Sequence, residues 1–167
     1  MYRRNASVIL LTLLAVLSAR PAGAVAPEAL DIDIQGEVFS VTRFPSGGDR
    51  LFLWVAPGYG TSDRVLQMAR ELAENRVEVW HVDLSENLFL PKSTTTMRSL
   101  DGRHVAGLIE AAHARTEKRV TLVSRSYGAL PLLKGARRWQ LSQLDHENDD
   151  GYLAGAILFS PSCTFKV

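Results

Sequence analysis

The serine best suited to chemistry in this sequence lies within the stretch Thr121–Leu133. This stretch runs from an apolar, β-branched segment through Ser124-Arg125-Ser126-Tyr127-Gly128 into a helical pattern. A residue at the tip of such a strand-to-helix turn has strained backbone angles, and small residues two positions before and after it let the two elements approach. The hydroxyl group of Ser126 would then project at a helix N-terminus, where the helix dipole favours developing negative charge. We therefore expect Ser126 to be a nucleophile; the alternative is a serine that only caps the helix.

A glycine-rich loop, Ala56-Pro57-Gly58-Tyr59-Gly60, follows another predicted strand and opens another helix. Gly58 and Gly60 could begin a dinucleotide-binding G-x-G-x-x-G motif. However, Asp63 stands where the third glycine would fall, and its carboxylate would point toward a phosphate group. The chain also contains no G-x-x-x-x-G-K-S/T sequence. We therefore expect neither a bound nucleotide nor another organic cofactor.

Further titratable residues lie near a predicted strand end and in a late loop. His81 and Asp83 share one face of their strand near its carboxyl end, and we interpret them as residues of the site wall. For His81, a purely structural role is the favoured interpretation. His104 and His113 lie on a predicted helix beside charged residues, so we expect both to be exposed. His146 lies in the loop 145–151, which precedes the last predicted strand and so lies roughly 23 Å from the edge that carries Ser126. This position excludes His146 as the catalytic base, and the spacing of the loop does not fit a calcium site.

Alternating strand and helix patterns define the elements that position these residues. The segment 31–44 alternates polar and apolar residues and predicts an antiparallel hairpin at a sheet edge. Near-continuous apolar runs predict buried strands within 50–60, 77–84, 119–126 and 152–161. Helices are indicated between them by three patterns: the stripe Val65, Met68, Ala69, Leu72 and Ala73; the stripe Met97, Leu100, Val105, Leu108, Ile109 and Ala112; and the segment 127–139.

This order of elements predicts an α/β fold, a mostly parallel sheet with helices on both faces and an N-terminal antiparallel hairpin. Ligands of such sheets bind beyond the carboxyl ends of the strands. The segments 56–60, 81–83, 124–128 and 160–162 should therefore meet at one edge, and we expect the site there.

With these elements in order, the chain resembles the α/β-hydrolase family from about Leu51 to Ser162, most closely at Ser124-Arg125-Ser126-Tyr127-Gly128. The resemblance implies that Ser126 is the nucleophile and that the backbone N–H of Tyr127 donates to the oxyanion. One departure is Ser124, which stands for the first glycine of G-x-S-x-G. Pro131 is a second irregularity, because a proline just past the first helical turn should bend the helix.

The loop at Gly58 looks like the oxyanion loop of that family, with Pro57 in place of its histidine. Proline has no backbone N–H, so the second oxyanion donor implied by the resemblance is the N–H of Tyr59. Family members carry their acid and histidine after the serine, on strands that would follow residue 167 here. We therefore expect the C-terminal part of the fold to be missing, through truncation or an incomplete gene model.

The resemblance implies a serine hydrolase of the esterase or acyl-hydrolase type, which transfers an acyl group of a small-molecule substrate to Ser126. Without the acid and the base, we expect little or no turnover from the chain as given. The alternative is a noncatalytic exported binding module that keeps the sheet and has lost the chemistry. The oligomeric state stays open.

The N-terminus predicts export. Residues 1–24 combine a basic start, an uncharged apolar run and a small-residue tail that ends at Ala24, the pattern of a cleaved signal peptide. The apolar run is shorter than the roughly 20 residues that span a bilayer, so we expect a periplasmic or secreted protein without a stable membrane span. Residues 31–167 would form the partial hydrolase domain.

Cleavage after Ala24 would leave a slightly acidic chain. It would remove three arginines from the 19 basic residues and none of the 18 acidic ones, for a net charge of about −2. A slightly acidic chain without a basic run is not expected to bind nucleic acid. Cys163 is the only cysteine, which excludes an internal disulfide and zinc sites built on paired cysteines, and we expect no metal site.

Overall fold

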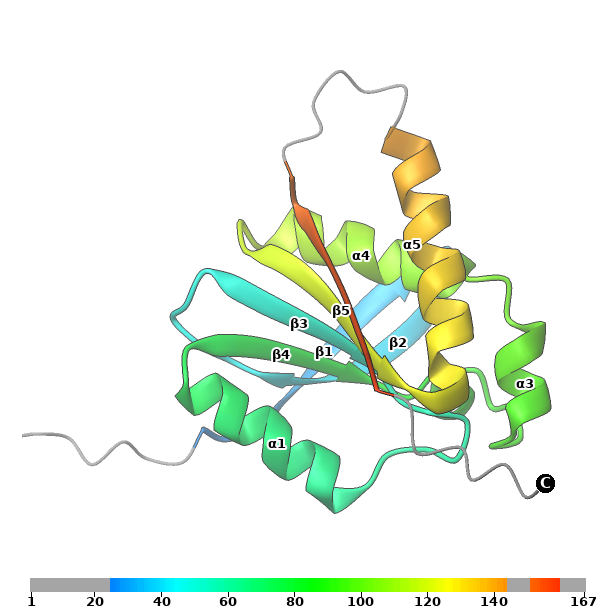
Figure 1. Ribbon diagram of the computed structural model, residues 1–167, viewed down its shortest axis with the longest axis horizontal. Coiled ribbons are helices and arrows are strands. Elements are labelled where there is room, and N and C mark those ends of the chain that lie inside the picture. The colour runs from blue at the N-terminus through cyan, green and yellow to red at the C-terminus, as the bar shows by residue number, and fades with distance from the viewer. Residues whose placement is uncertain (1–24, 144–150, 160–167) are drawn as a thin grey trace, which may run out of the picture.

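The computed structural model describes residues 25–143 and 151–159, which form a six-stranded sheet with helices on both faces (Figure 1). The strands are β1 (Glu28–Ile34), β2 (Glu37–Phe44), β3 (Arg50–Val55), β4 (Val77–Val82), β5 (Arg119–Arg125) and β6 (Leu153–Phe159). The α-helices are α1 (Asp63–Glu74), α2 (Leu84–Asn87), α3 (Thr94–Ser99), α4 (Arg103–Arg115) and α5 (Ala129–Gln143), and the 3₁₀ helix η1 covers Ser126–Gly128. The predicted signal peptide, His146, the segment 160–162 and Cys163 lie outside the described residues.

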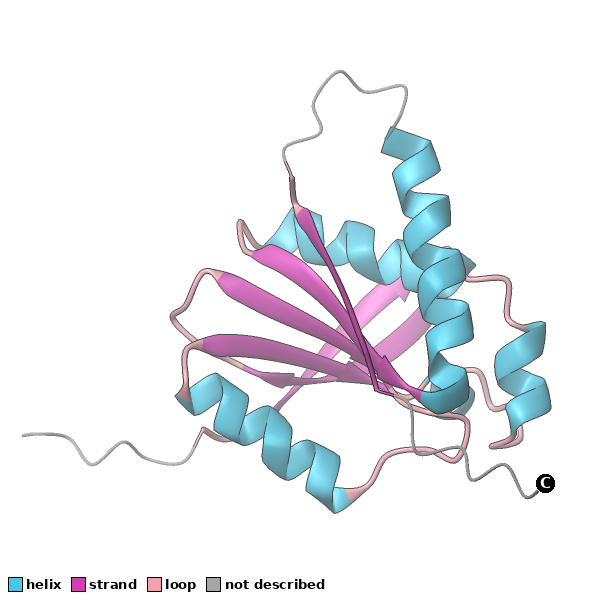
Figure 2. Ribbon diagram, viewed as in Figure 1, coloured by secondary structure: helices cyan, strands magenta, loops and turns pink. Residues whose placement is uncertain are grey.

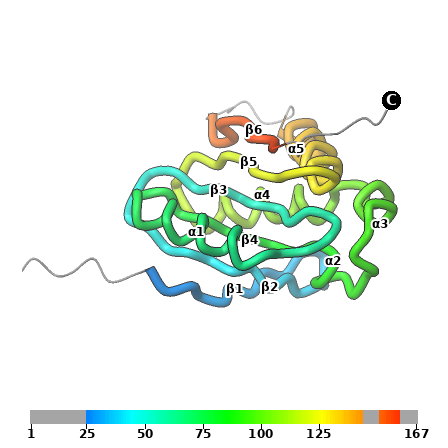
Figure 3. Tube along the Cα trace, turned by 60° about the horizontal axis from the view of Figure 1, so that its bottom comes forward, coloured from blue at the N-terminus to red at the C-terminus, as the bar shows by residue number. Residues whose placement is uncertain are grey.

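The strand order is β1-β2-β4-β3-β5-β6, which Figure 3 shows from the hairpin at the bottom to β6 at the top. β1 and β2 pair antiparallel around a two-residue turn, Gln35 and Gly36, whose φ angles of 57° and 87° suit the twist of a hairpin. β2 pairs antiparallel with β4 over only three residue pairs, from Thr42 to Phe44. The remaining pairs, β3 with β4, β3 with β5 and β5 with β6, are parallel. The predicted fold class is thus confirmed.

Two apolar layers hold the sheet between its helices. α4 and α5 cover one face and α1 covers the other, as Figure 2 shows. Under α1, buried Val65, Ala69 and Ala73 pack against strand residues that include Trp54 and Val79. These three helical positions belong to the predicted stripe, because residues three to four apart share one face of a helix.

The predicted helix that would carry Met97 and Val105 on one face is in fact two helices, α3 and α4. Leu100 ends α3 in an extended conformation, with ψ at 130°, and Gly102 has φ at 87°, so the helical path stops between them. A side chain at Gly102 would also collide with the backbone of α5, since a Cβ there would lie 2.4 Å from the nitrogen of Gly135. Apolar periodicity alone did not reveal this break, although Asp101-Gly102 is a typical turn dipeptide and Asp101 Oδ1 accepts from the N–H of Arg103 at 2.9 Å where α4 begins.

The predicted bend at Pro131 does not occur, because Pro131 lies in the first turn of α5. η1 precedes α5, so α5 begins at Ala129 and Pro131 falls in its first turn. The first backbone N–H groups of a helix have no partner within that helix, so a missing N–H at Pro131 removes no hydrogen bond there. Pro131 is therefore buried in a position that suits proline, and the expectation of a bend was wrong.

A buried charge ties the strands together at their amino ends. Glu78 is fully buried and accepts hydrogen bonds from Arg43 Nε at 2.7 Å, Lys118 Nζ at 2.5 Å and Trp80 Nε1 at 2.8 Å. Burial by itself would raise the pKa of Glu78, but these hydrogen bonds outweigh it and hold the pKa below its ordinary value. The carboxylate therefore stabilises the fold above its unfolded pKa, and that contribution is lost as the pH falls through the folded value.

We expect Glu78→Gln to lower the free energy of unfolding by about 3 kcal/mol at neutral pH, because two partly buried cations lose their counter-charge. Urea unfolding of both proteins measures this difference. Glu74→Gln, on the exposed side of α1, serves as the control and should stay within about 0.5 kcal/mol of the parent chain. Equal stability of the two variants would show that the Glu78 network adds nothing.

Candidate active site

Ser126 lies at the turn between β5 and η1, at the carboxyl edge of the sheet. Its φ angle is 53°, a left-handed conformation that a residue with a side chain adopts at a cost of roughly 1–2 kcal/mol. The residue is half-buried. Strained backbone of this kind persists where the surrounding structure enforces it, and it occurs preferentially at functional sites.

The surrounding structure that enforces this turn consists of Ser124 and Gly128. Gly128 packs so tightly that a Cβ there would lie 2.5 Å from Ser124 Oγ and 2.6 Å from the carbonyl oxygen of Ala56. Ser124 is fully buried, and its hydroxyl donates to the carbonyl oxygen of Val55 at 2.9 Å. A serine at position 124, where the motif has glycine, therefore fits this turn. Its hydroxyl has the carbonyl oxygen of Val55 as a hydrogen-bond partner, and Gly128 has no side chain that would collide with it.

The loop after β3 reaches the same edge. The N–H of Gly60 donates to the carbonyl oxygen of Pro57 at 2.8 Å and closes a tight turn. Gly58 lies against the segment before α3, where a Cβ would be 2.7 Å from the carbonyl oxygen of Ser93. Within the described residues, the backbone N–H groups of Tyr59 and Tyr127 form no hydrogen bond. Neither N–H group is therefore committed to another of the described residues.

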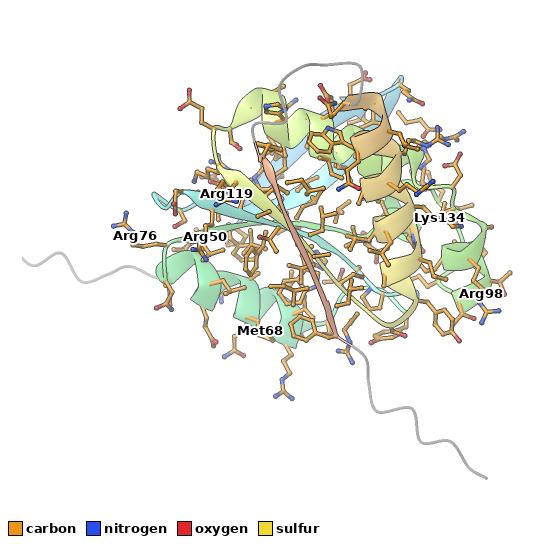
Figure 4. The ribbon with its side chains drawn as sticks, turned by 45° about the horizontal axis from the view of Figure 1, so that its top comes forward. Arg50, Met68, Arg76, Arg98, Arg119 and Lys134 are labelled. Carbon is orange, nitrogen blue, oxygen red and sulfur yellow. The ribbon has the colours of Figure 1, made fainter. Side chains whose placement is uncertain are left out.

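Two arginines for which the sequence predicts no role lie over the side chains of these tyrosines. The Arg125 guanidinium lies 5.5 Å from the centre of the Tyr59 ring, and that of Arg98 lies 5.0 Å from the centre of the Tyr127 ring. Arg98 Nη2 also donates to the Tyr127 hydroxyl at 3.3 Å. In Figure 4, Arg98 on α3 and Lys134 on α5 lie on the same side of the molecule, and Lys134 Nζ donates to the carbonyl oxygen of Arg98 at 2.8 Å. No sequence motif marks this arrangement, because Arg98 and Tyr127 are 29 residues apart and Tyr59 and Arg125 are 66 residues apart in the chain (125 − 59 = 66).

Asp83 lies at the predicted edge, but its carboxylate is engaged. One oxygen accepts from the N–H of Glu86 at 3.1 Å and caps α2, and the other lies 3.1 Å from Lys92 Nζ. A Cβ at Gly60 would lie 3.2 Å from the same carboxylate, so Asp83 borders the loop after β3. It supports the wall of the edge through these contacts.

His81 lies under α1, away from the turn at Ser126. It is 3% exposed, it pairs with Trp54 across β3 and β4, and its Nε2 has no hydrogen-bond partner among the described residues. Burial lowers its pKa to about 4, although the nearby charge of Asp83 favours the protonated form. Since β3 separates β4 from β5, His81 is roughly 10 Å from the strand that carries Ser126.

The other described histidines are engaged elsewhere. His104 Nε2 lies 2.7 Å from a carboxylate oxygen of Glu37, and the residue is 6% exposed, so the expectation that it faces solvent was wrong. His113 stacks on Tyr152, with 4.1 Å between ring centres. In residues 25–143 and 151–159, no histidine forms a hydrogen bond with Ser126. The same residues contain no cluster of three metal-ligating side chains, and no helix among them has the length and apolarity to cross a bilayer.

The low pKa of His81 predicts a pH dependence of stability. Between pH 6.5 and about 4, the unfolded chain binds a proton at His81 that the folded chain does not. The free energy of unfolding therefore decreases as the pH is lowered through this window. The loss from this residue between pH 8 and pH 5 should be about 2 kcal/mol. Urea unfolding at the two pH values should show a smaller loss for His81→Gln than for the parent chain, and equal losses would contradict the prediction.

Comparison with known proteins gives structural neighbours only. No family model matches the sequence, and no curated protein matches it either. A cold-adapted esterase from an Arctic intertidal metagenomic library aligns with a TM-score of 0.51 at 13% identity, over 81% of this chain and 58% of that chain. A dienelactone hydrolase from Anabaena variabilis aligns with a TM-score of 0.55 at 13% identity, over 81% of this chain and 62% of that chain.

An α/β-hydrolase-fold protein of unknown function aligns with a TM-score of 0.56 at 15% identity, over 80% of this chain and 44% of that chain. This chain therefore spans less than two thirds of the length of each of these structures. At such identities the similarity establishes the fold and not the reaction. The described residues have an α/β-hydrolase-like fold, with Ser126 at the strand-to-helix turn after β5.

Proposed function

We propose that this chain carries the nucleophile and the oxyanion donors of a serine hydrolase that acts on ester-type bonds of small molecules. The observation that carries the proposal is the left-handed backbone of Ser126, at a strand-to-helix turn beside the loop of Tyr59. The missing side chain of Gly128 and the buried hydrogen bond of Ser124 make this tight turn possible. A serine that only caps a helix does not require a left-handed backbone or such close packing. The esterase and the dienelactone hydrolase among the structural neighbours support the same class of reaction.

In the proposed reaction, Ser126 Oγ attacks the acyl carbon and a bond forms between them. The electron pair of the carbonyl moves to its oxygen, where the N–H groups of Tyr59 and Tyr127 would stabilise the negative charge. When the intermediate collapses, the bond to the leaving alkoxide breaks, and the proton taken from Ser126 passes to that alkoxide. Water then attacks the acyl-enzyme in the same way and releases the acid.

The base that takes the proton from Ser126 would come from outside the described residues. His81 is buried under α1, and His104 and His113 are engaged with Glu37 and Tyr152. A serine hydroxyl without a base is a weak nucleophile at neutral pH. The proposal therefore includes low intrinsic turnover for this chain, and a noncatalytic binding module stands as the alternative.

Exogenous imidazole can test the nucleophile because it supplies the missing base. We expect a fluorophosphonate probe to label Ser126, and saturating imidazole should raise the labelling rate roughly tenfold or more. Peptide mass spectrometry after labelling identifies the modified residue. Ser126→Ala should remove the imidazole-dependent labelling, while Ser142→Ala, at an exposed serine on α5, should leave it unchanged.

Labelling that spreads over several serines, or that survives in Ser126→Ala, would contradict the role of Ser126. No labelling with an intact circular dichroism spectrum would favour the binding module.

We also propose that the chain is exported and cleaved after Ala24, which the three-part pattern of residues 1–24 supports. When the full sequence is expressed in a bacterial host, N-terminal sequencing of the periplasmic or secreted product should begin at Val25. Ala24→Leu should block this cleavage, because the processing enzyme requires a small residue at that position. A product that retains residues 1–24 in the parent chain would contradict the proposal.

A further inference from the structure

A hollow of about 510 Å³ lies on the α1 face of the sheet, two strands away from Ser126. Its walls come from β2, from the start of α1 and from the segment between β4 and residue 89. Figure 3 shows α2 next to β2 at this place. The hollow is lined by Val38, Ser40, Thr42, Thr61, Leu66, His81, Asp83, Glu86, Asn87 and Phe89.

The hollow exists because β2 leaves β4 early. The two strands pair only from Thr42 onward, so the backbone of Ser40 faces no strand on that side. The Asn87 side chain takes the place of a strand there. Its Oδ1 accepts from Ser40 N at 2.6 Å, and its Nδ2 donates to Ser40 O at 3.2 Å. The side chain therefore fixes the wall and keeps the two strands apart.

Phe89 forms the outer wall of the hollow, although its backbone is strained and its side chain is exposed to solvent. It follows α2 with φ at 52°, where its N–H donates to Glu86 O at 3.2 Å and the N–H of Leu90 donates to Ser85 O at 2.8 Å. This pattern ends a helix at a left-handed residue, usually glycine, and a bulky residue is strained there. The Phe89 side chain is also 96% exposed, so packing within the described chain does not explain it.

The floor of the hollow is polar, and Asp83 and Glu86 with the single cation Lys92 leave it one negative charge in excess. Neither the hydroxyls of Ser40, Thr42 and Thr61 nor Nε2 of buried His81 forms a hydrogen bond within the described residues. The two carboxylates of the lining share one cation, because Lys92 Nζ lies 3.1 Å from Asp83 and 3.4 Å from Glu86.

The lining residues suit some classes of ligand better than others. An anion would meet two carboxylates, and the lining itself contains no lysine or arginine. A cation would have to displace Lys92 from its two partners. A purely apolar ligand would leave the polar floor without partners, which is costly. A neutral ring with several hydroxyls and one apolar face satisfies both the floor and the aromatic wall.

We propose that this hollow binds a neutral sugar ring, which stacks on Phe89 and forms hydrogen bonds with the hydroxyls of β2 and Thr61. This site does not involve Ser126, and it holds whether or not the chain is a hydrolase.

The experiment is an amide NMR titration of the purified chain with three probes: methyl β-D-glucopyranoside, methyl β-D-galactopyranoside and methyl α-D-mannopyranoside. We expect saturable shifts from at least one of them, confined to residues 38–42, 61–66 and 81–90. Choline and acetate serve as charged controls and should give no saturable shifts at these residues.

Phe89→Gly separates a binding role from a structural one. The variant should bind the sugar roughly tenfold more weakly, because the aromatic face is lost. Its Tm should stay equal or rise, since glycine suits the left-handed backbone. Thr42→Val keeps the shape of the strand residue and should weaken binding several-fold, whereas Leu141→Ala, at an exposed leucine of α5, should not change it.

Three results would each overturn the proposal. They are the absence of saturable shifts from all three sugars, unchanged affinity in both Phe89→Gly and Thr42→Val, and preferential binding of choline or acetate.

Discussion

The close approach of Gly128 to Ala56 is the contact on which the candidate site depends. β3 and β5 are parallel neighbours in which Val55 pairs with Ser124, so the turns that follow the two strands start side by side. The Ser124 hydroxyl then joins them with its hydrogen bond to the carbonyl oxygen of Val55. A larger residue at position 128 would push these turns apart, and the N–H groups of Tyr59 and Tyr127 would no longer belong to one site.

The two ends of the sheet carry unlike polar residues. At the amino ends, the charge of Glu78 is fully buried and matched by Arg43, Lys118 and Trp80, so its hydrogen-bonding capacity is used within the protein. At the carboxyl ends, several polar groups have no hydrogen-bond partner among residues 25–143 and 151–159, and two residues are strained. Ser126 and Phe89 have left-handed backbones, and the N–H of Tyr59 is unpaired among the described residues. Left-handed backbone is not confined to this edge, since Gln35 in the hairpin turn and Arg76 before β4 also have positive φ. Strain and unpaired polar groups lower stability and are retained where they serve binding or chemistry, which fits the site proposed at Ser126.

Much of the fold could be predicted because each element bears its own local pattern. The hairpin follows from alternation around Gly36, and the buried strands follow from continuous apolar runs at regular spacing along the chain. The failures have a common cause in contacts between distant segments. The break at Gly102 depends on α5, and the burial of His104 depends on Glu37 of the hairpin. Neither contact can be read from apolar periodicity, and only the turn dipeptide Asp101-Gly102 marks the break locally.

The sequence by itself determined the order of strands and helices and singled out Ser126, because apolar periodicity and a small-x-Ser-x-Gly turn are local properties of the chain. Only the tertiary structure decided which polar groups share a site. It placed His81 under α1, set Arg98 and Arg125 on the tyrosines, and opened a hollow beside Phe89. The reason is physical: strand order and the early separation of β2 from β4 fix these distances, and both arise from packing between segments that the sequence keeps far apart.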